Sequence, residues 1–283
     1  MISIDKCYKG LTKNIGVLCL LASFTLAAHD DHGGTAKYLG NSAILVQSAQ
    51  TKVLFDPFFH RDFGIYQLVP EDIRNAIFQG LAPYDKMDYI FISHAHDDHF
   101  SAIDLLHYLI KHTKVQLIAP KQAIDKLAAL DDFESYAKAI LPRVHTVTLN
   151  YGDRAWSKTI NHTKVSAVRI PHAGWPGRAN VENMVFRVTL PDGTTIMHMG
   201  DADPDDEHYL PYTAHWQKQV TDTAFPPYWF FYSAEGRDIL HEIINAKHHI
   251  GVHVPVVIPQ RLIETKQSYF SAPGQVIKLK IPE

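Results

Sequence analysis

Short apolar runs rich in β-branched and aromatic residues alternate with amphipathic stretches along most of the chain. Such runs favour extended structure, so we expect a strand at each. The predicted strands are Ala43–Gln47, Lys52–Asp56, Asp88–Ser93, Val115–Ala119, Val144–Leu149, Lys164–Ile170, Asn183–Thr189, Thr194–Met199, Trp229–Tyr232, Ile250–Val254 and Gln275–Ile281. Helices are predicted at Pro70–Gly80, Ser101–Lys111, Lys121–Leu130 and Gly236–Ala246. Two halves that mix strands and helices in this way indicate packed sheets with helices outside.

The N-terminal segment has a different pattern. Three lysines, Lys6, Lys9 and Lys13, precede the apolar run Ile15–Leu26, and small residues close it at Ala27 and Ala28. This order is typical of a secretory signal peptide, and the run is shorter than the roughly 20 residues that a membrane span needs. We therefore expect a signal peptide at 1–28, a linker at 29–35 and one domain at 36–283, with a buried N-terminal helix as the alternative. A signal peptide predicts that the protein is periplasmic or secreted.

Composition narrows the functional classes. The chain has 283 residues, of which 46% are hydrophobic and 20% charged, as in an ordinary globular protein. Lys and Arg number 27 against 30 Asp and Glu, so no basic excess exists to bind nucleic acid. Both cysteines, Cys7 and Cys19, lie in the predicted signal peptide, so the mature chain has no thiol for catalysis or metal binding. Histidine is abundant, at 18 residues.

One cluster of histidines and aspartates carries the predicted chemistry. The segment from Ser93 to His99 reads SHAHDDH and follows a predicted buried strand. His94 and His96 are two residues apart, so both point to one side of an extended segment. Asp98 and His99 follow in the turn and can face a second position nearby. Imidazole and carboxylate are ligands for divalent metals, and zinc is the usual choice for such a set.

Three further residues offer the remaining ligands of such a site. His172, Asp201 and His253 each follow or end an apolar β-like run, where metal ligands can converge on one sheet edge. His248 and His249 lie close to His253, and either is an alternative for the last ligand.

This pattern resembles the metallo-β-lactamase superfamily. The order H-x-H-x-D-H, then a histidine, an aspartate after glycine and a final histidine is that family's order, and Asp56 in FDP matches its early strand-end aspartate. The Tyr38–Ser42 start and the FDP element look most like the branch of ascorbate-6-phosphate lactonase-like and N-acylphosphatidylethanolamine phospholipase D-like proteins. The resemblance implies an α/β fold, a four-layer αββα sandwich, with two divalent metal ions between the sheets.

The resemblance also implies a role for each residue. His94, His96 and His172 would hold one ion, while Asp98, His99 and His253 would hold the other. Asp201 would bridge both ions, and Asp56 would accept a hydrogen bond from a ligand histidine. Zn²⁺ is the expected metal, with Mn²⁺ and Fe²⁺ as alternatives.

The expected activity is metal-dependent hydrolysis of an ester, lactone or phosphodiester-type bond by a metal-bridging hydroxide, with Asp98 as proton acceptor. An aspartate at position 201 stands where the commonest zinc β-lactamases carry cysteine, so β-lactam hydrolysis is not the expected main activity. Phospholipase or phosphodiesterase specificity, or a metal-binding protein without catalysis, are the alternatives.

The expected substrate is a small or lipid-like molecule. Trp175 and Arg178 follow His172 and are candidates to contact it, with Arg178 suited to an anionic group. Phe58, Phe59, Phe63 and Tyr66 form either a hydrophobic lip for a lipid-like substrate or part of the core.

Overall fold

A computed structural model describes residues 34–279 of the chain. The predicted signal peptide and residues 29–33 of the predicted linker lie outside the described residues. Thr35, the last predicted linker residue, instead begins strand β1 (Thr35–Gly40). No helix in the described part of the chain is both long and apolar enough to cross a membrane.

The first of two sheets has seven strands in the order β13-β1-β2-β3-β4-β5-β6. Its other strands are β2 (Ala43–Ser48), β3 (Thr51–Phe55), β4 (Tyr89–Phe91), β5 (Gln116–Pro120), β6 (Val144–Val147) and β13 (Val276–Lys278). Strands β3 to β6 run parallel, because helices carry the chain back between them. These helices are α1 (Glu71–Gln79), α2 (Ala102–Lys111), α3 (Lys121–Ala128) and α4 (Phe133–Ile140), the last followed by the short η1 (Leu141–Arg143).

The second sheet has six strands in the order β12-β11-β10-β9-β8-β7. They are β7 (Trp156–Ile160), β8 (Thr163–Arg169), β9 (Met184–Thr189), β10 (Thr195–His198), β11 (Thr221–Phe225) and β12 (Ala246–His249). Short helical segments accompany this sheet: η2 (Asp206–His208), η3 (Leu210–Tyr212), α5 (Thr213–Trp216), η4 (Tyr228–Tyr232), α6 (Ala234–Asp238), the π-turn η5 (Ile239–Ile243) and α7 (Gln260–Glu264).

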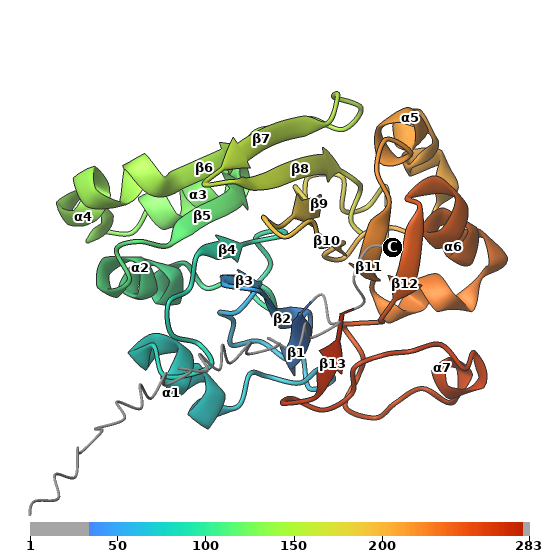
Figure 1. Ribbon diagram of the computed structural model, residues 1–283, viewed down its shortest axis with the longest axis horizontal. Helices are drawn as coiled ribbons and strands as arrows, with labels where there is room; N and C mark the ends of the chain where they lie inside the picture. The colour runs from blue at the N-terminus through green and yellow to red at the C-terminus, as the bar shows by residue number, and fades with distance from the viewer. Residues whose placement is uncertain (1–33, 280–283) are drawn as a thin grey trace, which may run out of the picture. The chain divides into compact units, whose positions relative to one another are not determined.

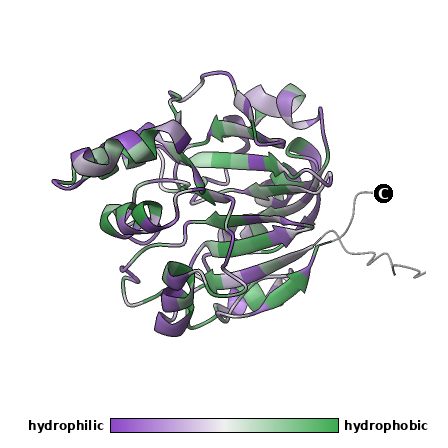
Figure 2. Ribbon diagram, turned by 60° about the vertical axis from the view of Figure 1, so that its left-hand side comes forward, coloured by the Kyte–Doolittle hydropathy of each residue, from purple (hydrophilic) through white to green (hydrophobic). Residues whose placement is uncertain are grey.

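Each sheet has a hydrophobic core on both of its faces, and successive side chains along a strand alternate between them. Leu54 and Ile90 face helices α1–α4, whereas Phe91 faces the second sheet and meets Phe186 with ring centroids 5.1 Å apart. On the outer face of the second sheet, Val185 packs with the helical segments there. Helices α1–α4 and α5–α6 accordingly lie on opposite sides of the paired sheets (Figure 1), and hydrophobic positions concentrate in the strands (Figure 2). The predicted four-layer αββα fold is confirmed.

Three predicted elements of the C-terminal third are wrong. Trp229–Tyr232 is not a strand but part of η4, which follows Pro226 and Pro227. Phe230 and Phe231 are both buried, and two consecutive buried side chains fit a helical turn better than the alternation of a half-buried strand. The predicted helix Gly236–Ala246 is divided between α6 and the π-turn η5, and its end belongs to β12.

The predicted strand Ile250–Val254 is likewise absent, because β12 ends at His249. Gly251 and Val252 make only isolated bridges, to Tyr269 and Pro227. The segment leaves the sheet at this point, and His253 adopts a left-handed backbone conformation with φ of 61°.

Candidate metal centre

The central parallel strand β4 delivers the first group of candidate ligands. After it ends, the chain runs extended through Ser93 and then turns sharply, with the amides of His99 and Phe100 donating to the His96 carbonyl oxygen at 3.0 and 2.8 Å. This turn places His94 and His96 on one side and Asp98 and His99 on the other. The local sequence therefore folds as its spacing predicts.

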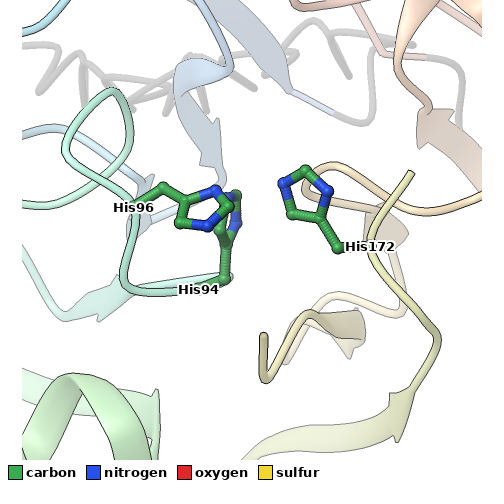
Figure 3. Close-up of side chains that lie close together, drawn as sticks. All are labelled: His94, His96 and His172. Atoms are coloured by element: carbon green, nitrogen blue, oxygen red, sulfur yellow. The ribbon is translucent and has the colours of Figure 1, made fainter. Parts of the chain in front are cut away.

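His94, His96 and His172 form one potential ligand set. A ring nitrogen of each lies within 4.8 Å of the others, and the three rings converge from the β4 and β8 ends (Figure 3). His172 is fixed by a bridge to Ala202 and by the Ala173 amide, which donates to the Asp201 carbonyl oxygen at 2.8 Å. The loops after β8 and β10 are thus held together behind the histidine rings.

Asp98, His99, Asp201 and His253 form the second set, with ligand atoms again within 4.8 Å of one another. Asp201 belongs to the second set and also reaches His172 of the first. Its Oδ1 is 3.1 Å from His99 Nε2, and its Oδ2 is 3.2 Å from His253 Nε2 and 3.4 Å from His172 Nε2. One carboxylate therefore contacts histidines of both sets, as a bridging ligand must.

The free ring nitrogens in this cluster fit a metal site. Nε2 of His94, His172 and His253 is buried without a hydrogen-bond partner. Ser93 Oγ donates to Asp56 and therefore accepts from His94 Nδ1 at 3.0 Å, while His172 Nδ1 donates to the Ala173 carbonyl oxygen at 2.8 Å. Both Nε2 atoms then carry a lone pair, and an unpaired buried polar atom is unfavourable unless something binds it. A divalent cation satisfies that requirement.

Asp56, at the end of β3, orients one of these ligands from behind. Its buried carboxylate accepts hydrogen bonds from the amide of Ser93 at 2.7 Å, the hydroxyl of Ser93 at 2.6 Å and Nδ1 of His99 at 2.9 Å. The last bond fixes the His99 tautomer so that Nε2 faces Asp201.

The two sets differ in their electrostatics. Burial, together with the neighbouring His172, lowers the pKa of His96 to about 4, and burial also lowers the pKa of His94. Burial has the same effect on His99 and His253, but the Asp201 carboxylate outweighs it and raises the pKa of both. Burial raises the pKa of Asp201, and the adjacent His253 and His99 reverse this and hold it well below its usual range. The site therefore holds an ionised carboxylate among histidines.

A cleft of about 570 Å³ opens over the ligands. Arg178 lines it, whereas Trp175 is not among its lining residues and packs against Tyr151 and His208 at ring distances of 5.1 and 5.6 Å. The remaining walls of the cleft come from the segment after β3, the His94–His99 turn and α3. They comprise Phe63, Ile65, Tyr66, Ala95, Asp97 and Lys126. Of the two residues proposed to contact substrate, only Arg178 reaches the cleft.

The aromatic residues after Asp56 divide into two groups. Phe58 and Phe59 are buried in the core beneath the helices, so they form no lip. Phe63 and Tyr66 line the cleft, and the ring of Tyr66 meets that of His253 at 4.1 Å. Trp229 also contacts His253, at a ring distance of 5.2 Å.

The other histidines near the site are placed apart from the ligands. His248 and His249 belong to β12 and join neither ligand set within the described residues. His249 packs against His241, at a ring distance of 4.4 Å. His198 stacks on Phe55 at 4.8 Å and bonds to the Ser42 carbonyl oxygen, which gives it a packing role.

Two asparagines that we did not predict as site residues hold the ligand loops in place. Asn41 donates to the Asp98 carbonyl oxygen at 2.9 Å and accepts from the His253 amide at 2.9 Å through its own carbonyl. Asn183 Oδ1 accepts from the Asp201 amide at 3.0 Å. The Gly40-Asn41-Ser42 turn could have identified Asn41 from the sequence. No sequence pattern distinguished Asn183.

Comparison with known proteins agrees with this architecture. A family model described as a β-lactamase superfamily domain matches residues 35–213, more than half of the chain. The chain therefore belongs to the β-lactamase superfamily. A search among curated proteins gave no match.

Solved structures share the fold at low sequence identity. A metallo hydrolase from Ignicoccus hospitalis, Igni18, is 13% identical, with a TM-score of 0.56 over 88% of this chain and 99% of that one. The metallo-β-lactamase fold protein YhfI from Bacillus subtilis is 13% identical, with a TM-score of 0.55 over 86% of this chain and 98% of that one. CmlA from Streptomyces venezuelae, a diiron β-hydroxylase, is 11% identical, with a TM-score of 0.51 over 88% of this chain and 54% of that one.

Proposed function

We propose that the protein is a metal-dependent hydrolase that binds two divalent ions, Zn²⁺ by preference. The observation that carries this proposal is the position of Asp201, whose two oxygens lie within 3.1–3.4 Å of His99, His172 and His253. Three histidines complete one site, and two histidines with Asp98 complete the other. Nitrogen and carboxylate donors in this proportion suit zinc.

Two such ions, when bound, lower the pKa of a water molecule and polarise the bond to be cleaved. The residues of the chain supply the rest. Asp98 lines the cleft, with Oδ2 3.5 Å from His253 Nε2, and the side-chain amide of Asn41 holds the turn by donating to the Asp98 carbonyl oxygen at 2.9 Å. From this position the Asp98 carboxylate can accept the proton of the attacking water. Neighbouring histidines lower its pKa despite burial, so it is ionised at neutral pH.

The cleft favours a small substrate with an anionic part and an apolar part. Arg178 supplies a guanidinium beside His172, with Nη1 3.3 Å from His172 Nδ1. Phe63 and Ile65 are 57% and 49% exposed and line the same cleft, so they can cover an aliphatic or aromatic substituent. An ester, lactone or phosphodiester of this kind is the substrate that we propose, and a lipid-like molecule is one member of the class.

The competing function is iron-dependent oxidation, which the fold similarity to a diiron β-hydroxylase brings into consideration. The same donors bind iron, so the metal and the reaction must be measured together. We expect zinc in the purified protein and hydrolysis without consumption of oxygen.

The test is elemental analysis of the purified protein, followed by a panel of chromogenic esters, lactones and phosphodiesters. His96→Ala removes a ligand that lines the cleft and should abolish turnover. His107→Ala, on the exposed face of α2, is the matched control and should retain activity. Equal turnover by the wild type and His96→Ala would contradict the proposal.

We also propose that residues 1–28 are removed on export to the periplasm or the medium. The support is the order of lysines, apolar run and small residues in the sequence. Mass spectrometry of the protein expressed with its own N-terminus should give a mature chain beginning near His29, and an intact Met1 in the cytoplasmic fraction would contradict export.

A further inference from the structure

A second polar pocket lies on the outer face of the second sheet, at the β7 edge. Its volume is about 420 Å³, and it shares no lining residue with the cleft over the metal ligands. Two rows of paired residues cross β7, β8 and β9 and line it: Ser157, Ser166 and Arg187 in one row, and Thr159, Lys164 and Thr189 in the other. Because strand side chains alternate, these six share one face of the sheet. That face is polar.

The charged side chains that line this pocket are all positive. Lys164, Arg187 and Lys218 line it with their charged side chains, and no aspartate or glutamate does. Lys158 stands on the other face of β7, where its Nζ lies 2.9 Å from His145 Nδ1. Within residues 34–279, Lys164, Arg187 and Lys218 form no ion pair with a carboxylate. The chain as a whole carries a net charge of −3, so this concentration of positive charge is local.

Arg187 is the buried member of the group. Its side chain donates to the carbonyl oxygens of Trp216 at 2.8 Å, Gln219 at 2.9 Å and His215 at 3.0 Å, and only 5% of the residue is exposed. These bonds hold the segment that carries His215 and Lys218 against the sheet. A buried cation without a counter-ion is unfavourable, so its position favours an anion nearby.

The histidine of the pocket responds to this charge. Burial, followed by the nearby Arg187 and Lys218, lowers the pKa of His215 to about 4. Burial lowers the pKa of Arg187 itself to about 10. The effect of Arg187 and Lys218 on His215 has the direction expected where positive charge is not neutralised by the protein.

We propose that this pocket binds a small ligand through a phosphate-type oxyanion. The hydroxyl groups of Ser157, Thr159 and Ser166 and the ammonium groups of Lys164 and Lys218 supply hydrogen bonds and charge to its oxygens. Arg187 fixes the pocket wall and contributes its charge from below. The volume lies in the range of small-molecule sites, and the site is independent of the hydrolase chemistry.

The test is calorimetric titration of the metal-loaded protein with inorganic phosphate. A Lys164→Gln/Lys218→Gln variant should weaken the binding of phosphate at this pocket at least about tenfold, since each lysine supplies a charge-assisted contact. A Lys114→Gln/Lys138→Gln variant, at two exposed positions outside the pocket, makes the same loss of two charges elsewhere and should bind as the wild type does. Any phosphate that the metal centre binds is bound equally by all three proteins, so the difference between isotherms reports the basic pocket.

Arg187 is not the residue to substitute, because its loss would release three carbonyl groups and unfold the pocket wall. Identical isotherms for the wild type and the double lysine variant would overturn the proposal. Binding to vesicles of phosphatidylglycerol that the double variant loses, with no phosphate binding at the pocket, would also overturn it in favour of a membrane surface. Neither outcome bears on the hydrolase activity.

Discussion

Asp56→Asn tests whether the carboxylate behind His99 sets the metal affinity of the second site. The aspartate accepts from the Ser93 amide, the Ser93 hydroxyl and His99 Nδ1 at 2.6–2.9 Å, in a position that is 1% exposed. The amide of asparagine keeps one acceptor oxygen but turns an NH₂ group toward the other donors. At least one hydrogen bond is lost, and a donor opposes a donor. The His99 ring is then free to adopt the wrong tautomer.

The expected loss of metal affinity can be judged from the usual effect of removing a hydrogen-bond partner of a ligand histidine. Loss of a group that orients a metal ligand costs about 10–100-fold in metal affinity or activity. Loss of one buried hydrogen bond to a charged group costs about 1.5–3 kcal/mol of folding stability in addition. Competition with a zinc-binding chromophore measures the affinity, and urea unfolding of the metal-free protein measures the stability.

Asp88→Asn is the control for that experiment. Asp88 also accepts from a backbone amide, that of Lys52 at 2.9 Å, but it precedes the first residue of β4, at the end of the strand away from the ligands. It should leave the zinc affinity unchanged. An Asp56→Asn protein that binds two zinc ions as tightly as the wild type would refute the orienting role.

Three further predictions concern backbone, charge and pH. Gly200→Ala should destabilise the protein by more than about 2 kcal/mol in urea unfolding, because Gly200 has φ of 55° and a Cβ would lie 2.3 Å from Asn183 Oδ1; a stable variant would contradict the packing described. Arg178→Gln should raise KM about tenfold for anionic substrates and leave KM for neutral ones unchanged. Equal effects on both would contradict a contact between the guanidinium and the anionic group. As the pH falls, protons should displace the ion held by His99 and His253, whose pKa values are raised, before the ion held by His94 and His96, whose pKa values are lowered. Metal content after dialysis at decreasing pH should therefore fall in two steps, and a single step from two ions to none would count against the ordering.

The sequence was most informative where local spacing decides geometry. The two-residue spacing of His94 and His96 on an extended segment, and the turn that carries Asp98 and His99, both follow from the backbone alone. The convergence of His172, Asp201 and His253 depends on two sheets meeting at one edge. The ends of apolar runs made these three residues candidates, and the family resemblance supplied their division between two ions.

The errors have two physical origins, which are tertiary packing and prolines next to an apolar run. Strand β11, which was not predicted, reads TDTAF, and its threonines and aspartate are buried, so its burial does not follow from hydrophobicity. The stretch from Trp229 to Tyr232 is apolar enough for a strand but forms a 3₁₀ helix after two prolines. Trp175 follows a ligand histidine in sequence, yet its ring packs on Tyr151 and His208.

Anomalous diffraction from crystals grown with zinc tests the dinuclear centre most directly. Two peaks should appear roughly 3.5–4 Å apart. One should lie among the nitrogens of His94, His96 and His172, and the other between Asp98, His99 and His253, with Asp201 in contact with both. A single peak at one set, or zinc only at sites elsewhere on the chain, would contradict the dinuclear centre.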